Sequence, residues 1–296
     1  SLHDALPIFS MAIVPKSKGD EDKISSGLYK LTEEDPTFTI SRDEENADTI
    51  ISGVGETHLD VIVNKLKNKF GVSIELKNPK IPYRETIRKV SDVQGKHKKQ
   101  SGGHGQYGDV KIKFEPRCDG ETDLLFVDKI VGGVVPKQYI PAVEKGLKES
   151  MKHGALAGFP VIGLKATLHD GSYHSVDSSE MAFKIAASIA YKKAMQQVDS
   201  VLLEPIMHLE VHVPNDYMGD VIADINKKRG RVLGMDSCGD LEKIIAEVPL
   251  AEVLKYATDL RALTGARGSF KMNFQRYEEV PYNEAEKIIN KIKENK

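Results

Sequence analysis

The stretch Ser101–Pro116, SGGHGQYGDVKIKFEP, decides between two kinds of fold. It contains a match to the pattern G-x-G-x-x-G at Gly103, Gly105 and Gly108, a spacing that can bind the phosphates of a dinucleotide. That function requires a buried apolar strand before the glycines and a helix directly after them, so that backbone amides point at the pyrophosphate. The flanking residues therefore decide what the glycines do.

The flanking residues do not meet these conditions. The residues before the glycines, KHKKQ (96–100), are polar and basic, and in DVKIKFEP (109–116) apolar residues alternate with lysines as in a strand with one buried face. The glycines are thus predicted to join two antiparallel strands, which excludes a dinucleotide fold. A kinase-like glycine loop also lies between antiparallel strands, but no accompanying base and metal-ligand set is visible, and G-x-x-x-x-G-K-[ST] is absent from the sequence. A small-molecule kinase stays as the least favoured alternative.

The composition is that of an ordinary soluble protein. The chain has 296 residues, a formal net charge of −2, 29% charged residues and 40% hydrophobic residues, so two or three domains are expected and any nucleic-acid surface must be a local patch. The two cysteines, Cys118 and Cys238, form no C-x-x-C pair, which favours a reducing cytoplasm. Since no apolar run approaches the ~18–20 residues needed to span a bilayer, we expect a cytoplasmic protein without a membrane segment.

Two blocks of the chain share one order of predicted elements. In residues 10–79 and again in 204–281, the hydrophobic periodicity gives the order β-α-β-β-α-β of a ferredoxin-like domain. Residues 80–203 are predicted to form a middle domain, and residues 282–296 a polar tail helix. Residues 1–9 are interpreted as a leader, with the hypothesis that this leader is foreign sequence. The predicted elements are helices at 20–34, 55–70, 217–229 and 252–264, and strands at 10–14, 37–42, 49–54, 72–76, 206–213 and 268–277, with a hairpin around Gly239-Asp240.

The glycine-rich loop is a candidate RNA-binding element. Lys98 and Lys99 precede it, and His104, Gln106 and Tyr107 are placed at its tip among glycines that let the backbone approach a partner closely. Basic, amide and aromatic side chains are suited to phosphates and to unstacked bases. A solvated hairpin with ordinary surface lysines remains the alternative.

A second loop, LHDGSYHSVDSSEM (168–181), offers two interpretations. Ser172, His174 and Asp177 have the residue types of a catalytic triad, but neighbours in one loop do not easily reach the required geometry. Asp177 followed by Glu180 instead predicts a capping box for the helix that follows, which leaves His174 exposed beside Tyr173. An exposed histidine can stack on RNA or be functionally idle.

Two further patterns are weaker. His208 and His212 lie on one face of a strand with no cysteine or further histidine nearby, so we expect no metal site. In KKRGR (227–231), Arg229 and Arg231 are either phosphate contacts or cations favoured by a helix C-terminus.

Long motifs in one order give the chain a family resemblance. Residues 10–281 resemble the C-terminal three domains of bacterial elongation factor G. His104, where the housekeeping factor usually has arginine, and GVGETHLD in place of GMGELHLD make the chain more similar to the divergent second-copy proteins of that family. The matching motifs are AIVPKSKGDEDK, EEDPTF, YRETI, SGGHGQYG, KIVGGVVPKQYIPAVEKGL, ALAGFPV, DGSYHSVDSSEMAFKIAAS, LLEPI, YMGDVIADINKKRGRV, VPLAEVLKYATDLR, ARGSF and RYEEVP.

The resemblance implies an α+β fold. Two ferredoxin-like domains would flank a middle domain of ribosomal-protein-like fold with a left-handed βαβ crossover, an exception to the usual handedness. The tip of that middle domain would enter the decoding region of the small ribosomal subunit and contact the duplex of transfer RNA and messenger RNA. The glycine-rich loop and DGSYHSVD match the family's two tip loops, so the resemblance implies that they lie together at this tip. Gln106 and His174 stand at the positions of the family's duplex-contacting residues.

The resemblance also implies partners and function. The last of the three domains would contact the GTPase-associated centre of the large subunit. The candidate RNA-binding residues are Lys98, Lys99, Gly103, His104, Gly105, Gln106, Tyr107, Ser172, Tyr173, His174, Arg229 and Arg231. We expect a monomeric, non-catalytic arm of a translational GTPase that promotes translocation, without cofactor or metal, because GTP and magnesium belong to the GTP-binding domain that these residues do not match. The alternatives are a ribosome-acting paralogue in recycling, rescue or antibiotic protection, and a structural scaffold.

Overall fold

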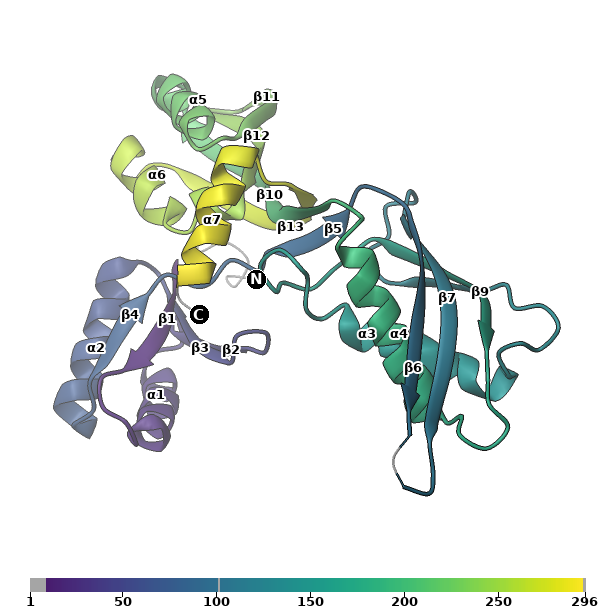
Figure 1. Cartoon of the computed structure of the whole chain (residues 1–296). Helices are drawn as coiled ribbons and strands as arrows, with labels where there is room; N and C mark the ends of the chain where they lie inside the picture. Colours follow the sequence, from purple (N-terminus) through teal and green to yellow (C-terminus); the bar gives the residue numbers. More distant parts are fainter. Residues whose placement is uncertain (1–8, 101, 295–296) are drawn as a thin grey trace. The chain divides into compact units, whose positions relative to one another are not determined.

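The computed structural model describes residues 9–100 and 102–294 (Figure 1). The chain divides into two compact units, one made of residues 1–82 and 205–276 and the other of residues 83–204 and 277–296, and each is described by itself. The predicted leader lies outside the described residues except for Phe9. That residue already belongs to the first strand and is buried, with 1% of its surface exposed.

The first ferredoxin-like order is confirmed. Strands β1 to β4 form one antiparallel sheet in the order β2-β3-β1-β4, and both helices bury one apolar stripe against it. Ile24, Leu28 and Leu31 of the first helix are buried, as their spacing predicts. The elements are β1 Phe9–Pro15, α1 Glu21–Glu34, β2 Thr39–Asp43, β3 Asp48–Gly53, α2 Glu56–Phe70 and β4 Ile74–Lys77.

The same arrangement recurs near the C-terminus. The strand order β11-β12-β10-β13 repeats that of the first sheet, and α5 and α6 supply the buried residues Val221, Ile225, Tyr256 and Leu260. The helix predicted at 252–264 begins only at Tyr256, because residues 250–252 form a separate 3₁₀ turn. The elements are β10 Ser200–Pro214, α5 Met218–Lys227, β11 Arg231–Cys238, β12 Leu241–Pro249, α6 Tyr256–Thr264 and β13 Ser269–Glu279.

Strand β10 is longer than its predicted core at 206–213. It runs from Ser200 through Pro205, and its first residues pair with β5 (Arg84–Ile87), while residues 206–214 pair with β12. The hydrophobic periodicity did not predict this continuation, because a proline after a glutamate, Glu204-Pro205, is typical of the end of a strand. The division between the two units falls inside this strand.

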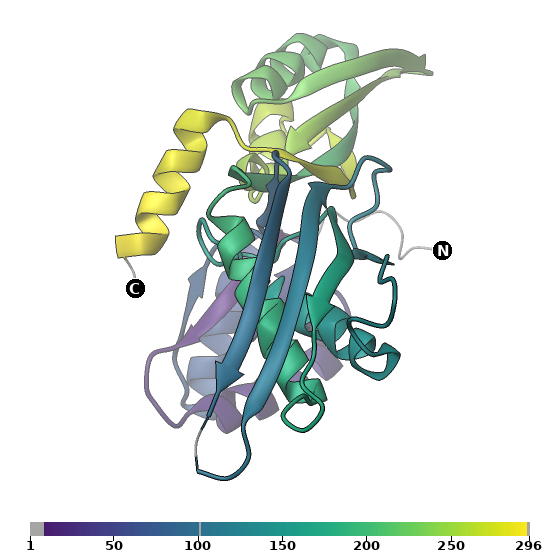
Figure 2. The same ribbon diagram turned by 45° about the vertical axis from the view of Figure 1, so that its right-hand side comes forward.

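The middle domain is one four-stranded sheet with two helices on one face, as Figures 1 and 2 show. Its strand order is β6-β7-β9-β8, antiparallel except for the parallel pair β8 and β9. That pair is joined through α3, which makes the predicted βαβ crossover. The elements are β6 Ser91–Lys99, β7 Gln106–Pro116, β8 Leu125–Asp128, η1 Lys137–Tyr139, α3 Ile140–Ser150, β9 Leu164–Ser172 and α4 Glu180–Met195.

Helix α4 lies very close to strands β6 and β7. It buries five alanines at 0% exposure, and the strands present glycine opposite them. A Cβ atom on Gly95 would lie 2.1 Å from the carbonyl oxygen of Ala186, and one on Gly108 would lie 2.5 Å from that of Ala182. Gly108, part of the glycine-rich stretch, is therefore required by packing.

The tail forms helix α7 (Tyr282–Glu294), as predicted. The chain leading to it, from residue 277, belongs to the unit of the middle domain: the amide of Val280 donates to the carbonyl of Leu202 at 2.9 Å, and Arg88 pairs with Glu279. Among the helices of residues 9–100 and 102–294, none combines the length and apolar character that crossing a bilayer requires.

Candidate RNA-binding tip

The tip of the middle domain consists of residues 102–108 and 172–178. Strands β6 and β7 pair as far as Lys99 and Gln106, so that Figure 2 shows a long hairpin whose closing turn lies at its far end. Gly102 and Gly103 adopt positive φ values of 35° and 126° in this turn, a backbone region that disfavours other residues. The sequence places Gln106 and Tyr107 at the tip of the loop. This placement is wrong, because both residues belong to β7 and pair with β6.

The two loops meet, as the family resemblance required. The amide of Tyr107 donates to the carbonyl of Asp177 at 2.9 Å, and the hydroxyl of Ser178 donates to the carbonyl of Tyr107 at 2.8 Å. The amide of Gly105 also donates to the Asp177 carboxylate at 3.2 Å. These hydrogen bonds tie the second loop to the start of β7.

The predicted capping box is wrong. The N-cap of α4 is Ser179, whose side chain accepts from the amide of Ala182 at 3.1 Å, and Glu180 is the first residue of the helix. Asp177 lies too early for that position and turns toward the glycine loop. A Cβ atom on Gly105 would lie 2.6 Å from the Asp177 carboxylate, so a side chain at this position would displace that carboxylate.

A buried carboxylate, that of Asp109, holds the tip residues in place through hydrogen bonds. Asp109 is 6% exposed, accepts from the side-chain amide of Gln94 at 2.7 Å and accepts from the hydroxyl of Ser172 at 2.6 Å. Because Ser172 donates its single hydroxyl hydrogen to Asp109, its oxygen accepts the bond of 2.6 Å from the Tyr107 hydroxyl. The polar atoms of Tyr107 and Ser172 are therefore used inside the domain, whereas the sequence predicts that both residues contact RNA.

His174 is exposed and held in a defined orientation. Its side chain is 51% exposed, and its Nδ1 atom accepts from the amides of Val176 at 3.2 Å and Asp177 at 3.0 Å. Two amides pointing at Nδ1 leave that nitrogen without a hydrogen, so the neutral ring carries its proton on Nε2. The ring lies 6.2 Å from that of Tyr107. Ser172, which donates to Asp109, makes no triad with His174.

The other candidate residues of the tip point to solvent. Gly103, His104 and Gln106 are exposed, and Tyr173 is 52% exposed. The Gln106 side-chain oxygen lies 2.7 Å from Nε2 of His97. No hydrogen bond found among the residues that the structure describes uses the amide nitrogen of Gln106, which stays available as a donor.

Charge is distributed unevenly along the outer face of the sheet. Away from the tip, Lys111 pairs with Asp170 at 2.8 Å; this hydrogen bond raises the pKa of Lys111 and lowers the pKa of Asp170. Near the tip, Lys98 and Lys99 are exposed and make no ion pair within the described ranges, and Lys96 lies over the ring of Tyr107 at 5.4 Å. The uncompensated positive charge is therefore concentrated at the tip.

Arg229 and Arg231 lie in the other unit. Arg229 pairs with Glu252 at 3.0 Å, and Arg231 pairs with Glu247 at 2.8 Å. Both guanidinium groups already have a carboxylate partner, although Arg231 remains 67% exposed.

The residues that support the tip are not apparent from the sequence. Asp109 lies in β7, whose inward positions are Val110, Ile112 and Phe114, so alternation predicts an outward, exposed side chain. It is buried because Gln94 and Ser172 from the neighbouring strands cover it. Nothing in the local pattern signals this, because both partners are remote in sequence.

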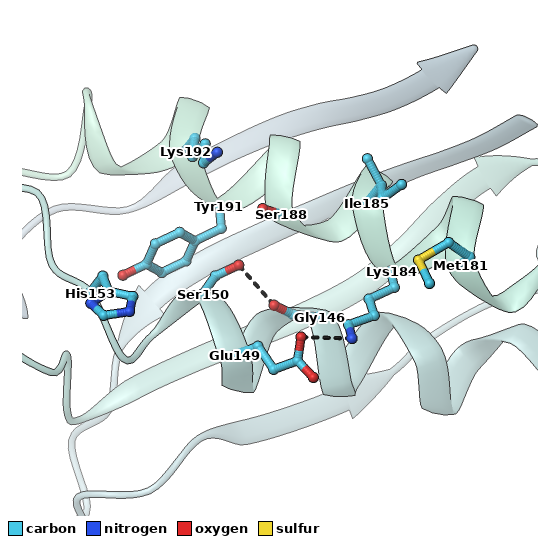
Figure 3. A pocket seen from close by; sticks show the side chains of 10 residues that line it. All are labelled: Gly146, Glu149, Ser150, His153, Met181, Lys184, Ile185, Ser188, Tyr191 and Lys192. Carbon is cyan, nitrogen blue, oxygen red and sulfur yellow. Dashed lines mark hydrogen bonds and ion pairs between the residues drawn. The ribbon is translucent and has the colours of Figure 1, made fainter. Parts of the chain in front are cut away.

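A groove of about 390 Å³ between α3 and α4 is the other candidate site of the middle domain (Figure 3). Two interactions join residues that line it: Lys184 pairs with Glu149 at 2.7 Å, and the Ser150 hydroxyl donates to the carbonyl of Gly146 at 2.8 Å. Burial raises the pKa of Tyr191, whose hydroxyl has no hydrogen-bond partner in the described part of the chain. Within residues 9–100 and 102–294, no cluster of three or more metal-binding side chains occurs. The tip is the better candidate.

Comparison with known families covers nearly the whole chain. Residues 5–78 match the model of elongation factor G domain III, residues 79–199 that of elongation factor G domain IV, and residues 201–288 that of the elongation factor G C-terminus. A crystal structure of a protein from Thermus thermophilus superposes with a TM-score of 0.89 at 48% sequence identity, over 96% of this chain and 42% of that one. This chain thus spans less than half the length of that relative. The α+β fold, the tip and the three successive family matches together show that the chain belongs to the elongation factor G family.

Proposed function

We propose that this chain is the RNA-contacting arm of a translational GTPase that promotes movement of transfer RNA and messenger RNA through the ribosome. The observation that carries the proposal is the convergence of two remote loops into one tip with exposed side chains and unpaired lysines. The family membership supports action on the ribosome in the cytoplasm, as a monomer, with the tip in the decoding region. GTP hydrolysis would take place in a separate GTP-binding domain.

The geometry assigns different roles to the tip residues. His174 would offer its Nε2 hydrogen and its ring face to the RNA, and Gln106 would offer its amide nitrogen. Lys98 and Lys99 would supply salt-dependent affinity for phosphates, which fixes position without reading sequence. Tyr107 and Ser172 would hold the two contact residues in place.

The test uses the complete factor with its GTP-binding domain. His174→Ala and Gln106→Ala should slow translocation at least tenfold in rapid-kinetic measurements, while ribosome-stimulated GTP hydrolysis stays within about twofold of the parent. His153→Ala, which removes an exposed histidine in the turn that follows α3, is the matched control and should change neither rate. If GTP hydrolysis fell in parallel with translocation, or if neither changed, these two residues would not have the proposed role.

A second function is favoured by one feature of the tip. His104 stands where the housekeeping factor usually has arginine, which suits a paralogue that acts in recycling, rescue or antibiotic protection. Poly-phenylalanine synthesis with the complete factor distinguishes the two, because only a translocating factor supports it.

A further inference from the structure

A third segment, residues 129–138, leaves the middle sheet at the same end as the tip. Strand β8 runs parallel to β9, with Asp128 opposite Leu168, and the amide of Lys129 donates to the carbonyl of Leu168 at 2.8 Å. Parallel strands end at the same edge of a sheet, and β9 leads directly into the second tip loop. The segment after β8 therefore emerges beside that loop.

The segment packs against the end of β9, and Tyr139, the residue that follows the segment, contacts the second tip loop. Val135 is fully buried, and its side chain lies 2.7 Å from where a Cβ atom on Gly171 would stand. Just beyond the segment, the Tyr139 hydroxyl donates to the carbonyl of Ser178 at 3.3 Å, and its ring stacks on Phe183 at 5.0 Å between centroids. These contacts hold the segment at a set position relative to His174.

The outward part of the segment combines positive charge with an exposed apolar side chain. Lys129 and Lys137 are exposed and have no carboxylate partner among the described residues. Between them, Val131 is 80% exposed. Gly132 and Gly133, both with a φ of 68°, form the turn that follows Val131. The sequence KIVGGVVPKQ contains no acidic residue, so its net charge is +2.

We propose that residues 129–138 are a third RNA-contacting element of the tip. The two lysines pair with phosphates of one RNA strand, and Val131 lies against the sugars or base edges in a shallow minor groove. Three properties match this partner: unpaired cations suit phosphates, an A-form minor groove is wide and shallow, and an apolar side chain between two cations fits a sugar face. The proposal rests on the proposed function, since it adds a contact to the same RNA surface.

The first test measures ribosome binding of the complete factor against salt concentration. The double variant Lys129→Ala/Lys137→Ala should lower the slope of log affinity against log salt by about 1.4 to 1.8, because each phosphate contact contributes about 0.7 to 0.9. The matched control, Lys145→Ala/Lys152→Ala, removes two exposed lysines of α3 and its C-terminal end and should leave the slope unchanged. Equal effects of both double variants, or an unchanged slope in the first, would overturn the proposal.

The second test separates this proposal from the proposed function. A diazirine side chain is placed at position 131 or at position 104 of the complete factor, which is then photo-cross-linked on ribosomes carrying transfer RNA. RNA adducts from both positions support the third element. Adducts from 104 alone, or a protein adduct from 131, overturn it while the proposed function stands. No RNA adduct from either position contradicts both.

Discussion

Tyr107 and Ser172, 65 positions apart in the chain, join their hydroxyl groups in a hydrogen bond of 2.6 Å. Ser172 in turn donates a hydrogen bond to the buried Asp109, so a chain of hydrogen bonds runs from the tip to the inside of the sheet. Tyr107 also supplies the backbone groups that hold Asp177 and Ser178. The residue thus connects the start of β7, which carries Gln106, with the loop that carries His174.

The first prediction concerns this hydrogen bond. Tyr107→Phe removes the donor to Ser172 and should lower the free energy of unfolding by about 1 kcal/mol, the usual net contribution of one such bond. Urea denaturation of the 296-residue chain measures it. Tyr173→Phe is the matched control, since that side chain is 52% exposed, and it should change stability by less than about 0.5 kcal/mol. Equal stability of both variants would show that the hydroxyl chain does not support the tip.

The second prediction concerns the contact between β7 and α4. Gly108→Ala would place a Cβ atom 2.5 Å from the carbonyl oxygen of Ala182, and since backbone must move, the middle domain should lose about 1 to 3 kcal/mol. Hydrogen exchange of β7 and α4 peptides should accelerate accordingly.

A control for this substitution comes from helix α5 of the other unit. A Cβ atom added to Gly219 would meet no other atom within 4 Å, so Gly219→Ala should instead stabilise its domain by about 0.5 to 1 kcal/mol through helix propensity. Unchanged exchange in Gly108→Ala would mean that helix α4 can move away from the sheet at little cost.

The third prediction concerns pH. Arg276, through two bonds of 2.7 Å, and then Arg231 lower the pKa of Glu247 to about 2 from 4.5. A lowered pKa in the folded state gives stability that is complete above the unfolded pKa and is lost as the pH falls from about 4.5 toward 2. The C-terminal ferredoxin-like domain should lose roughly 2 to 3 kcal/mol over this range from this group.

The measurement is urea denaturation, followed by circular dichroism, between about pH 6 and about pH 3. Glu247→Gln should be less stable at neutral pH and should show a flatter decline in acid. Asp236→Asn removes an exposed strand carboxylate with no ion pair in the described ranges and should keep the parental slope. If the free energy of unfolding of Glu247→Gln declined with pH as steeply as that of the parent, this ion pair would be excluded as the source of the acid sensitivity.

The fourth prediction concerns nucleotides. The glycines of the tip form a hairpin turn and contacts to Asp177 and α4, so they are not arranged as a phosphate cradle. Calorimetry on the 296-residue chain should detect no binding of GTP or ATP at micromolar concentrations, whereas the complete factor should bind GTP. Micromolar affinity of the chain itself would revive the kinase-like alternative.

The sequence by itself determined most of the helices and strands and their order along the chain. The spacing of Ile24, Leu28 and Leu31 predicts one buried helix stripe, and the alternation in β7 predicts a strand with one buried face; both are observed. Such patterns succeed because burial of apolar side chains follows the local period of a helix or strand. Family motifs added the expectation that the two loops converge.

Only the tertiary structure decided how the tip is built. Asp109 is hydrogen-bonded to Ser172, 63 positions away, and Gly105 to Asp177, 72 positions away. Local periodicity could therefore predict neither the burial of Asp109 nor the role of Asp177. The capping prediction for Asp177 failed for this reason, since Ser179 was a closer cap and the glycine loop offered the carboxylate another donor. Likewise, the parallel pairing of β8 with β9 places Lys129 and Val131 beside the tip. Hydrogen bonds between remote segments depend on which strands become neighbours, and that is decided when the whole sheet forms.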